Sequence, residues 1–190
     1  MKAVVFFATR EGQTAKIGEH IAADLRARGL GVDVVNVRTP PLSIPWADYA
    51  IAFVAASVHG ERHEKEMVQF VRHHRDDLDE LHAVFMSVSM SEAGAEDPVA
   101  STERRQRSAA DAQRMIDRFI KETGWKPERC LPVAGALLYT HYNFLIRFIM
   151  KRISRANGGP TDTSRDYEFT DWAGLDRFVD EIVGAKDVKA

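Results

Sequence analysis

The residues Thr9–Thr14, T-R-E-G-Q-T, bring two hydroxyl side chains and one glycine together at a single turn. They directly follow the apolar run Ala3–Ala8 and lead into Thr14–Arg28, whose apolar side chains recur at helical spacing. The first amides of a helix lack intrahelical partners and carry partial positive charge, so this junction suits a phosphate. Gly12 lets the backbone approach an anion closely. The candidate phosphate-binding residues are Thr9, Arg10, Glu11, Gly12, Gln13 and Thr14.

This stretch lacks two common phosphate-binding patterns and resembles a third. It matches neither G-x-G-x-x-G nor G-x-x-x-x-G-K-[ST], so neither a dinucleotide fingerprint nor a Walker loop is indicated. Thr9, Gly12 and Thr14 match the flavodoxin phosphate loop, [ST]-x-T-G-x-T, and this resemblance implies FMN as the cofactor. Glu11 stands where flavodoxins usually have threonine, so its carboxylate either points away or accepts backbone N–H bonds that shape the loop. An ordinary polar turn is the alternative interpretation.

Two further polar segments, Ser57–His63 and Ser87–Ser101, are expected as loops at the same edge of the sheet. Ligands of open parallel sheets bind beyond the carboxyl ends of the strands, where these segments would lie. Neither segment contains Trp or Tyr to stack on a flavin, which leaves His59 or Met90 as the stacking partner and an open flavin face for a substrate. The candidates near the flavin ring are Ser57, Val58, His59, Ser87, Val88, Ser89 and Met90.

The elements that must position these residues alternate between short apolar runs and amphipathic segments, which predicts a parallel sheet covered on both faces. The predicted strands are Ala3–Ala8, Val32–Val37, Ala50–Ala56, Ala83–Val88 and Leu131–Leu138. The predicted helices are Thr14–Arg28, His63–Leu81, Thr102–Thr123 and Thr170–Val183, the last with Thr170 as N-cap. We expect an α/β fold: a flavodoxin-like three-layer α-β-α sandwich, sheet order 2-1-3-4-5, an insert around residues 139–169, and one domain over residues 1–190.

Composition excludes several classes of protein. The formal net charge of −2 argues against a general nucleic-acid binder. Cys130 is the only cysteine, so no internal disulfide can form, which fits a reducing cytosol. The N-terminal apolar run is too short for a signal peptide, and no stretch of about 18 apolar residues predicts a membrane span. We therefore expect a cytoplasmic protein, with peripheral contact at the inner face of the cell membrane still allowed.

Over nearly its whole length the chain resembles the flavodoxin-like, menaquinone-dependent protoporphyrinogen IX dehydrogenase family. The shared stretches are T-R-E-G-Q-T at 9–14, A-S-V-H-G at 56–60, S-V-S at 87–89, W-K-P-E-R-C at 125–130, A-G-A-L at 134–137, R-F-I-M-K at 147–151, G-G at 158–159, T-D-T at 161–163 and T-D-W at 170–172. The resemblance implies FMN-dependent dehydrogenation of a porphyrinogen substrate in haem biosynthesis, with electrons passed to a membrane quinone.

The insert contains a basic segment interleaved with aromatic side chains. Read as a helix, Tyr142–Arg155 forms one apolar arc, made of Tyr142, Leu145, Ile146, Ile149, Met150 and Ile153, with basic residues opposite. Such a pattern suits a flat anionic porphyrinogen or an anionic membrane surface. Alternatively, the two phenylalanines pack under a neighbouring loop. The candidate substrate or membrane residues are Phe144, Arg147, Phe148, Lys151 and Arg155.

Two other functions stay open from the residues alone: a flavodoxin-like electron-transfer protein and an NAD(P)H:quinone reductase. The former predicts a strongly acidic surface, which the net charge of −2 does not favour.

The scattered histidines lack the spacing of a metal site, so no metal is expected. No residue stands out as the catalytic acid or base; His59 and Tyr139 are only guesses. The oligomeric state, including a homo-oligomer, is left open.

Overall fold

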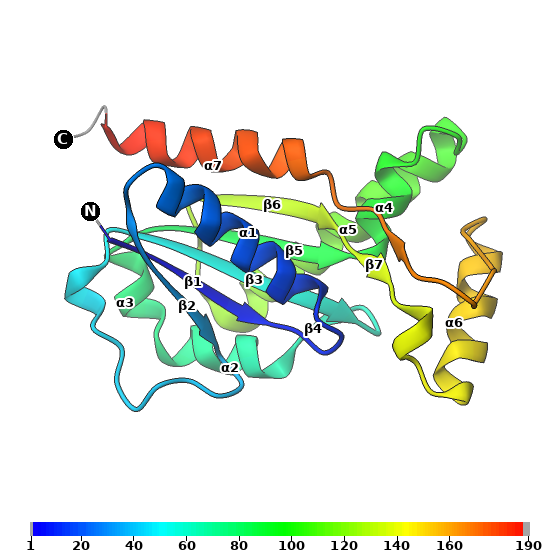
Figure 1. Cartoon of the computed structure of the whole chain (residues 1–190), viewed down its shortest axis with the longest axis horizontal. Helices are drawn as coiled ribbons and strands as arrows, with labels where there is room; N and C mark the ends of the chain where they lie inside the picture. The colour runs from blue at the N-terminus through cyan, green and yellow to red at the C-terminus, as the bar shows by residue number, and fades with distance from the viewer. Residues whose placement is uncertain (1, 188–190) are drawn as a thin grey trace.

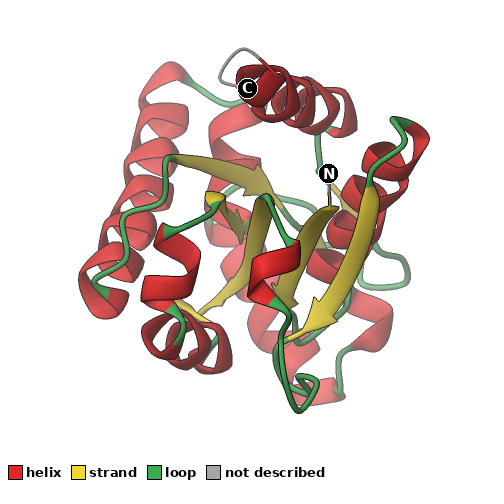
Figure 2. Cartoon of the chain, turned by 90° about the vertical axis from the view of Figure 1, so that its left-hand side faces the viewer, coloured by secondary structure: helices red, strands yellow, loops and turns green. Residues whose placement is uncertain are grey.

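The computed structural model describes the backbone of residues 2–187 and side chains as far as Gly184. Five parallel strands form its main sheet, in the spatial order β2-β1-β3-β5-β6 (Figures 1 and 2). This confirms the predicted order 2-1-3-4-5, because β5 and β6 are the fourth and fifth parallel strands along the chain. The strands are β1 (Lys2–Ala8), β2 (Gly31–Asn36), β3 (Ile51–His59), β5 (His82–Ser89) and β6 (Arg129–Ala134).

Helices cover both faces of this sheet, and successive strand residues face opposite helix layers. On β1, Val4 and Phe6 pack toward one layer, whereas Ala3 and Val5 pack toward the other, and all four are fully buried. The first layer holds α2 (Lys65–His73), α3 (Arg75–Asp79) and α5 (Thr102–Thr123). The second layer holds α1 (Gln13–Ala27) and α7 (Trp172–Asp187). Burial on both faces explains why the strand sequences are apolar nearly throughout.

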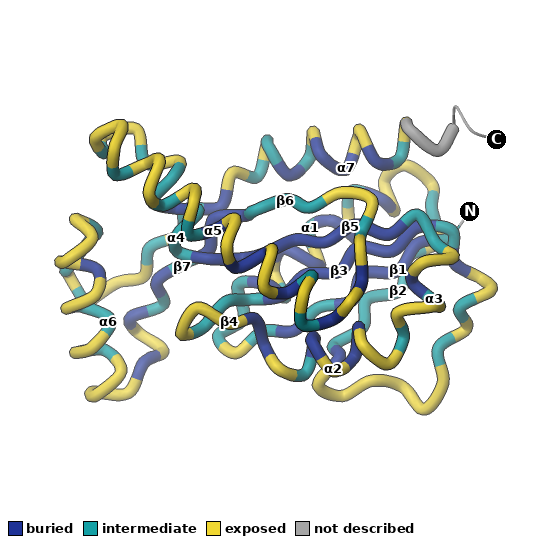
Figure 3. The backbone as a smooth tube through the Cα atoms, turned by 180° about the vertical axis from the view of Figure 1, so that it is seen from behind, coloured by how far each residue is buried: buried dark blue, intermediate teal, exposed yellow. Residues whose placement is uncertain are grey.

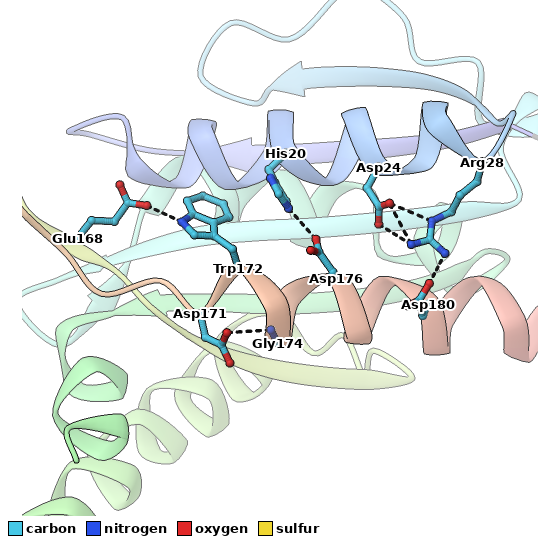
Figure 4. Close-up of polar contacts among 9 residues, drawn as sticks. All are labelled: His20, Asp24, Arg28, Glu168, Asp171, Trp172, Gly174, Asp176 and Asp180. Carbon is cyan, nitrogen blue, oxygen red and sulfur yellow. Dashed lines mark hydrogen bonds and ion pairs between the residues drawn. The ribbon is translucent and has the colours of Figure 1, made fainter.

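Polar contacts fix α7 beside α1 (Figure 4). His20 on α1 lies 2.7 Å from a carboxylate oxygen of Asp176, and Arg28 pairs with Asp180. The N-cap prediction for α7 was wrong by one residue: Asp171 Oδ1 accepts the bond from Gly174 N, at 2.9 Å. Thr170 instead donates its hydroxyl to the carbonyl oxygen of Ala134 at the end of β6, at 2.8 Å.

Four segments differ from the sequence-based expectation. The strand expected over Leu131–Leu138 ends at Ala134, and Ala136–Leu137 forms the separate short strand β7 in a second sheet. The loop expected from Ser57 is strand as far as His59, and a turn at Gly60 and Glu61, with φ of 56° and 62°, returns the chain as the short strand β4 (Arg62–His63). The loop expected at Ser87–Ser101 contains α4 (Met90–Glu96), whose first turn is capped by Ser89. The helix expected over His63–Leu81 starts at Lys65 and breaks at His74 into α2 and α3.

The insert forms a separate small layer at the carboxyl end of the sheet (Figure 1). It consists of β7 (Ala136–Leu137), a 3-10 turn at Tyr139–His141, α6 (Phe144–Ala156) and β8 (Tyr167–Glu168), which pairs antiparallel with β7. Asn143 caps α6 by accepting a bond from Ile146 N at 3.0 Å, so the helix begins at Phe144 and leaves Tyr142 outside it. Its own apolar cluster joins Leu137, Tyr139 and Tyr142 with Met90, Met150, Tyr167 and Phe169.

Candidate functional site

A cleft lies where the carboxyl ends of β1, β3, β5 and β6 meet. Ten of its described lining residues were predicted from the sequence, and four were not. The predicted ones are Thr9, Glu11, Gln13, Thr14, Ser57, Val58, His59, Val88, Ser89 and Met90. The others are Gly135, Ala136, Tyr142 and Met150. The remaining candidates Arg10, Gly12 and Ser87 are not among the described residues that line this cleft, and each has a different place beside it.

Gly12 shapes the phosphate loop through its backbone. Its φ of +106° is in the region that L side chains rarely adopt, and its amide donates to Thr9 Oγ1 at 3.0 Å. The first bond of α1 runs from Lys16 N to the carbonyl oxygen of Gly12, at 3.0 Å, so the amides between these residues lie in the unpaired first turn.

Thr14 is the residue of this loop that points most directly to an anionic ligand. Thr14 is fully buried, yet its hydroxyl oxygen Oγ1 has no hydrogen-bond partner among the described residues. A buried hydroxyl without a partner costs about 1–3 kcal/mol, so such groups are rare in native proteins. A phosphate seated on the first turn of α1 would accept this hydroxyl together with the free amides. The residues present therefore fit the terminal phosphate of a flavin mononucleotide.

Arg10 is turned from the loop toward a buried carboxylate. Its Nε lies 3.2 Å from Oε1 of Glu64, whose side chain is 1% exposed. His59 reaches the same oxygen through Nε2, at 3.4 Å, and burial lowers the pKa of this imidazole. Arg10 thus balances the charge of Glu64 and holds the start of α2 against the loop Thr9–Thr14.

Ser87 lies beneath the cleft and is fully buried. Its Oγ lies 2.9 Å from Nε2 of His63, whose ring packs edge-on against Phe85 and Phe119. Burial lowers the pKa of His63 to about 3, so the imidazole is neutral at physiological pH. This pair fixes the end of β5 and the short strand β4 to each other below the cleft.

Glu11, the residue that departs from the flavodoxin pattern, connects the phosphate loop to the insert. Its Oε2 accepts a bond from the phenolic hydroxyl of Tyr142, at 2.9 Å, across 131 positions of sequence. Burial and the Glu11 carboxylate raise the pKa of Tyr142, which keeps the phenol protonated as a donor. Arg147 holds this end of the insert by donating to the carbonyl oxygens of Tyr139 and Tyr142, each at 2.9 Å.

The aromatic side chain missing from the two expected loops comes from the insert, since Tyr142 lines the cleft. Only proximity in the fold reveals this, because the sequence places Tyr142 far from every cleft residue that was predicted. Gly135 and Ala136 could have been found, because they lie in the predicted strand Leu131–Leu138 and the carboxyl ends of parallel strands meet.

A larger groove of about 1130 Å³ opens beside the cleft, between α4, α5 and the insert. Met90 and Met150 line both spaces, so the groove continues from the cleft. Its charged lining includes Glu96, whose pKa is raised to about 7 by partial burial and by the carboxylates of Glu92 and Asp171.

Much of α6 is exposed (Figure 3), and the exposed side chains include a row of large apolar ones. Phe144 is 85% exposed and Phe148 52%, so the alternative that they pack under a loop was wrong. Most of the predicted apolar arc is also turned outward; its exposed members are Leu145, Ile146, Ile149 and Ile153. Arg155 is exposed as well, whereas Arg147 and Lys151 are half-buried. No described helix is both long and apolar enough to cross a bilayer.

The comparisons with known proteins agree with this geometry. The sequence matches the flavodoxin domain family over residues 4–164. Oxidised flavodoxin 1 from Bacillus cereus shares the fold with a TM-score of 0.50 at 16% identity, covering 97% of this chain and 98% of that one. The flavodoxin of Streptococcus pneumonia TIGR4 also gives 0.50, at 20% identity over 97% and 99%. Fold and cleft thus define a flavodoxin-type α/β domain.

The sequence relatives identify one family within the flavodoxin-type proteins. A protein of Escherichia coli K12 named protoporphyrinogen IX dehydrogenase [quinone] is 31% identical over 98% of this chain and 97% of its own length. A Leishmania major protein of the same name is 27% identical over 95% of this chain and 74% of its own. The chain belongs to this protoporphyrinogen IX dehydrogenase family of flavodoxin-like oxidoreductases.

We expect Gly12→Val to abolish FMN retention, because a β-branched residue resists the left-handed backbone that presents the first-turn amides. Gly29→Val is the matched control: Gly29 also has positive φ, +83°, and at both positions an added Cβ meets nothing within 4 Å. Both variants should lose about 1–3 kcal/mol of unfolding free energy. Quenching of added FMN fluorescence measures retention, and equal retention by the two variants would show that the loop is misassigned.

We expect Tyr142→Phe to loosen the insert, because it removes the hydroxyl that donates a hydrogen bond to the Glu11 carboxylate. Trypsin should cut after Arg152 and Arg155 several-fold faster than in the wild type, as local opening becomes more frequent. Tyr167→Phe is the control within the same insert, since its hydroxyl accepts a hydrogen bond from the exposed Arg165, at 3.0 Å. Mass spectrometry of the fragments gives the rates, and equal rates for both variants would contradict a coupling through Glu11.

Proposed function

We propose that this chain is an FMN-dependent dehydrogenase that oxidises protoporphyrinogen IX in haem biosynthesis and passes the electrons to a membrane quinone. The observation that carries the proposal is the buried, unpartnered hydroxyl of Thr14 beside the left-handed Gly12, at a cleft that opens into a groove of about 1130 Å³. The cleft supplies a phosphate seat, and the groove supplies room for a large second molecule. The names of the family relatives support the choice of porphyrinogen and quinone.

Bound FMN would supply the acceptor for the two electrons of each dehydrogenation step. The residues that would hold its phosphate are Thr9, Gln13, Thr14 and the amides after Gly12. The ends of β3 and β5 would flank the ring through Ser57–His59 and Val88–Met90. The insert would close the remaining side with Tyr142 and Met150, and it would limit the access of water to the reacting atoms.

The test is anaerobic stopped-flow mixing of the FMN-loaded protein with protoporphyrinogen IX, with NADPH, or with buffer. We expect the flavin absorbance to bleach with protoporphyrinogen IX and to stay unchanged with NADPH. Adding a menaquinone analogue afterwards should restore the absorbance. Bleaching by NADPH alone would favour the NAD(P)H:quinone reductase. No bleaching by either reductant would leave an electron-transfer protein as the better interpretation.

We further propose that the outer face of α6 docks the protein on an anionic membrane surface, where a quinone is available. Phe144, Leu145 and Phe148 are 85%, 64% and 52% exposed on a helix that also presents Arg152 and Arg155 to solvent. Exposed aromatic and aliphatic side chains among arginines suit the boundary between headgroups and acyl chains. Peripheral attachment of this kind needs no membrane-spanning helix.

We expect the double variant Phe144→Ser/Phe148→Ser to bind vesicles of phosphatidylglycerol and phosphatidylcholine about a hundredfold or more weakly, because each buried phenylalanine contributes about 1.5–3 kcal/mol and about 1.4 kcal/mol is a factor of ten. Leu42→Ser is the control, since Leu42 is fully exposed in the connection after β2, away from α6. Co-sedimentation measures binding, and flavin content should be unchanged in both variants. Equal binding of both variants would contradict docking through α6, and lost flavin would place these residues in the fold instead.

A further inference from the structure

The groove runs along α4, from the proposed flavin-binding cleft at one end to the positively charged side chain of Arg104 at the other. Met90, the first residue of α4, lines both spaces, and Asp97 directly follows the last residue of that helix. Seven helical residues rise about 10 Å, so the two ends of the groove are about one macrocycle apart. At the far end stands Arg104, on the first turn of α5.

Arg104 is the only cationic side chain among the described residues that line this groove. The other charged lining residues are all acidic: Glu61, Glu96, Asp97, Asp111 and Asp171. Partial burial of the Arg104 side chain, which is 33% exposed, strengthens its attraction for an anion relative to a fully solvated arginine.

Two neighbours hold the guanidinium of Arg104 at the groove and leave it capacity for a ligand. Its Nη2 lies 3.5 Å from Oδ2 of Asp97, a long ion pair. Its Nη1 lies so close to Gly158 that a Cβ added there would be 2.5 Å away, and Gly158 itself has a positive φ of 64°. The insert therefore packs directly against this arginine.

We propose that Arg104 binds a carboxylate of the tetrapyrrole and so orients the macrocycle, with its opposite edge at Met90 and the flavin-binding cleft. This inference rests on the proposed function and adds the orientation of the substrate. Protoporphyrinogen IX carries both propionates on one edge and apolar vinyl groups across the ring. The apolar edge matches the methionines Met90 and Met150, and the anionic edge matches Arg104.

The test compares binding of protoporphyrin IX with binding of its dimethyl ester to the FMN-loaded protein, measured by the Soret absorbance shift without turnover. We expect Arg104→Met to weaken binding of the diacid about tenfold, as loss of a charge-assisted bond does, and to leave ester binding unchanged. Arg104→Lys should keep part of the preference for the diacid. Arg107→Met is the matched control, because Arg107 lies three residues along α5 and is 74% exposed.

A second variant keeps the test decisive if Arg104→Met does not fold. Asp97→Asn removes the competing charge and keeps Oδ1, which accepts the bond from Val99 N at 3.0 Å. We expect it to bind the diacid several-fold more tightly and the ester as before.

The outcomes separate the two proposals. Equal losses of diacid and ester binding in Arg104→Met, or a diacid loss equal to that of Arg107→Met, would overturn the role of Arg104 and leave the dehydrogenase assignment standing. If the wild type binds neither porphyrin but is bleached by protoporphyrinogen IX, this groove is not the binding site. Absence of both binding and bleaching would overturn the proposed function as well.

Discussion

The turn at Gly12 is the constraint on which the site depends. β1 lies in the middle of the sheet, between β2 and β3, and its side chains are buried on both faces. The chain must therefore leave β1 abruptly at the carboxyl edge, and the left-handed backbone of Gly12 allows α1 to begin at once. The same step brings unpaired amides and the buried hydroxyl of Thr14 to the edge of the sheet where the other four parallel strands also end.

The helix α6 of the insert is oriented opposite to a usual amphipathic surface helix, whose apolar side faces the core. Its inner side is largely polar, with Arg147 donating to two carbonyl oxygens and Ser154 donating to that of Pro160 at 2.7 Å. Its outer side is apolar, although a helix that only completed the core would turn those side chains inward. Hydrogen bonds thus hold α6 in place, and its apolar face is left available for another surface.

Much of the fold could be predicted because buried parallel strands and the glycine-containing loop have strong local signals. The strand runs, the sheet order and the loop Thr9–Thr14 depend on neighbouring residues and on one topological rule. The helix α4 could not be predicted, because M-S-E-A-G-A-E is short and lacks an apolar period. The exposure of the apolar side of α6 could not be predicted either. Periodicity identifies an apolar arc on a helix, but it does not say whether that arc faces the core or the solvent.

Tyr142 was missed for a related reason: its partner Glu11 lies 131 residues away, and no local pattern reports such a contact. The departure of Glu11 from the flavodoxin pattern was the available signal. A carboxylate beside a phosphate site is unfavourable unless a donor compensates it, so an unusual acidic residue there indicates a donor elsewhere in the fold. In this chain the donor is the phenol of Tyr142 on the insert.

The distribution of charge along the groove favours one orientation of an anionic ligand by repulsion as well as attraction. A carboxylate placed near Asp171 or Glu96 would meet like charge in a partly desolvated space, which costs more than the same contact in water. Above about pH 7, where Glu96 ionises, this repulsion increases. Because Arg104 stands among carboxylates, it marks one position for an anion, whereas a broad basic patch would bind anions in many registers.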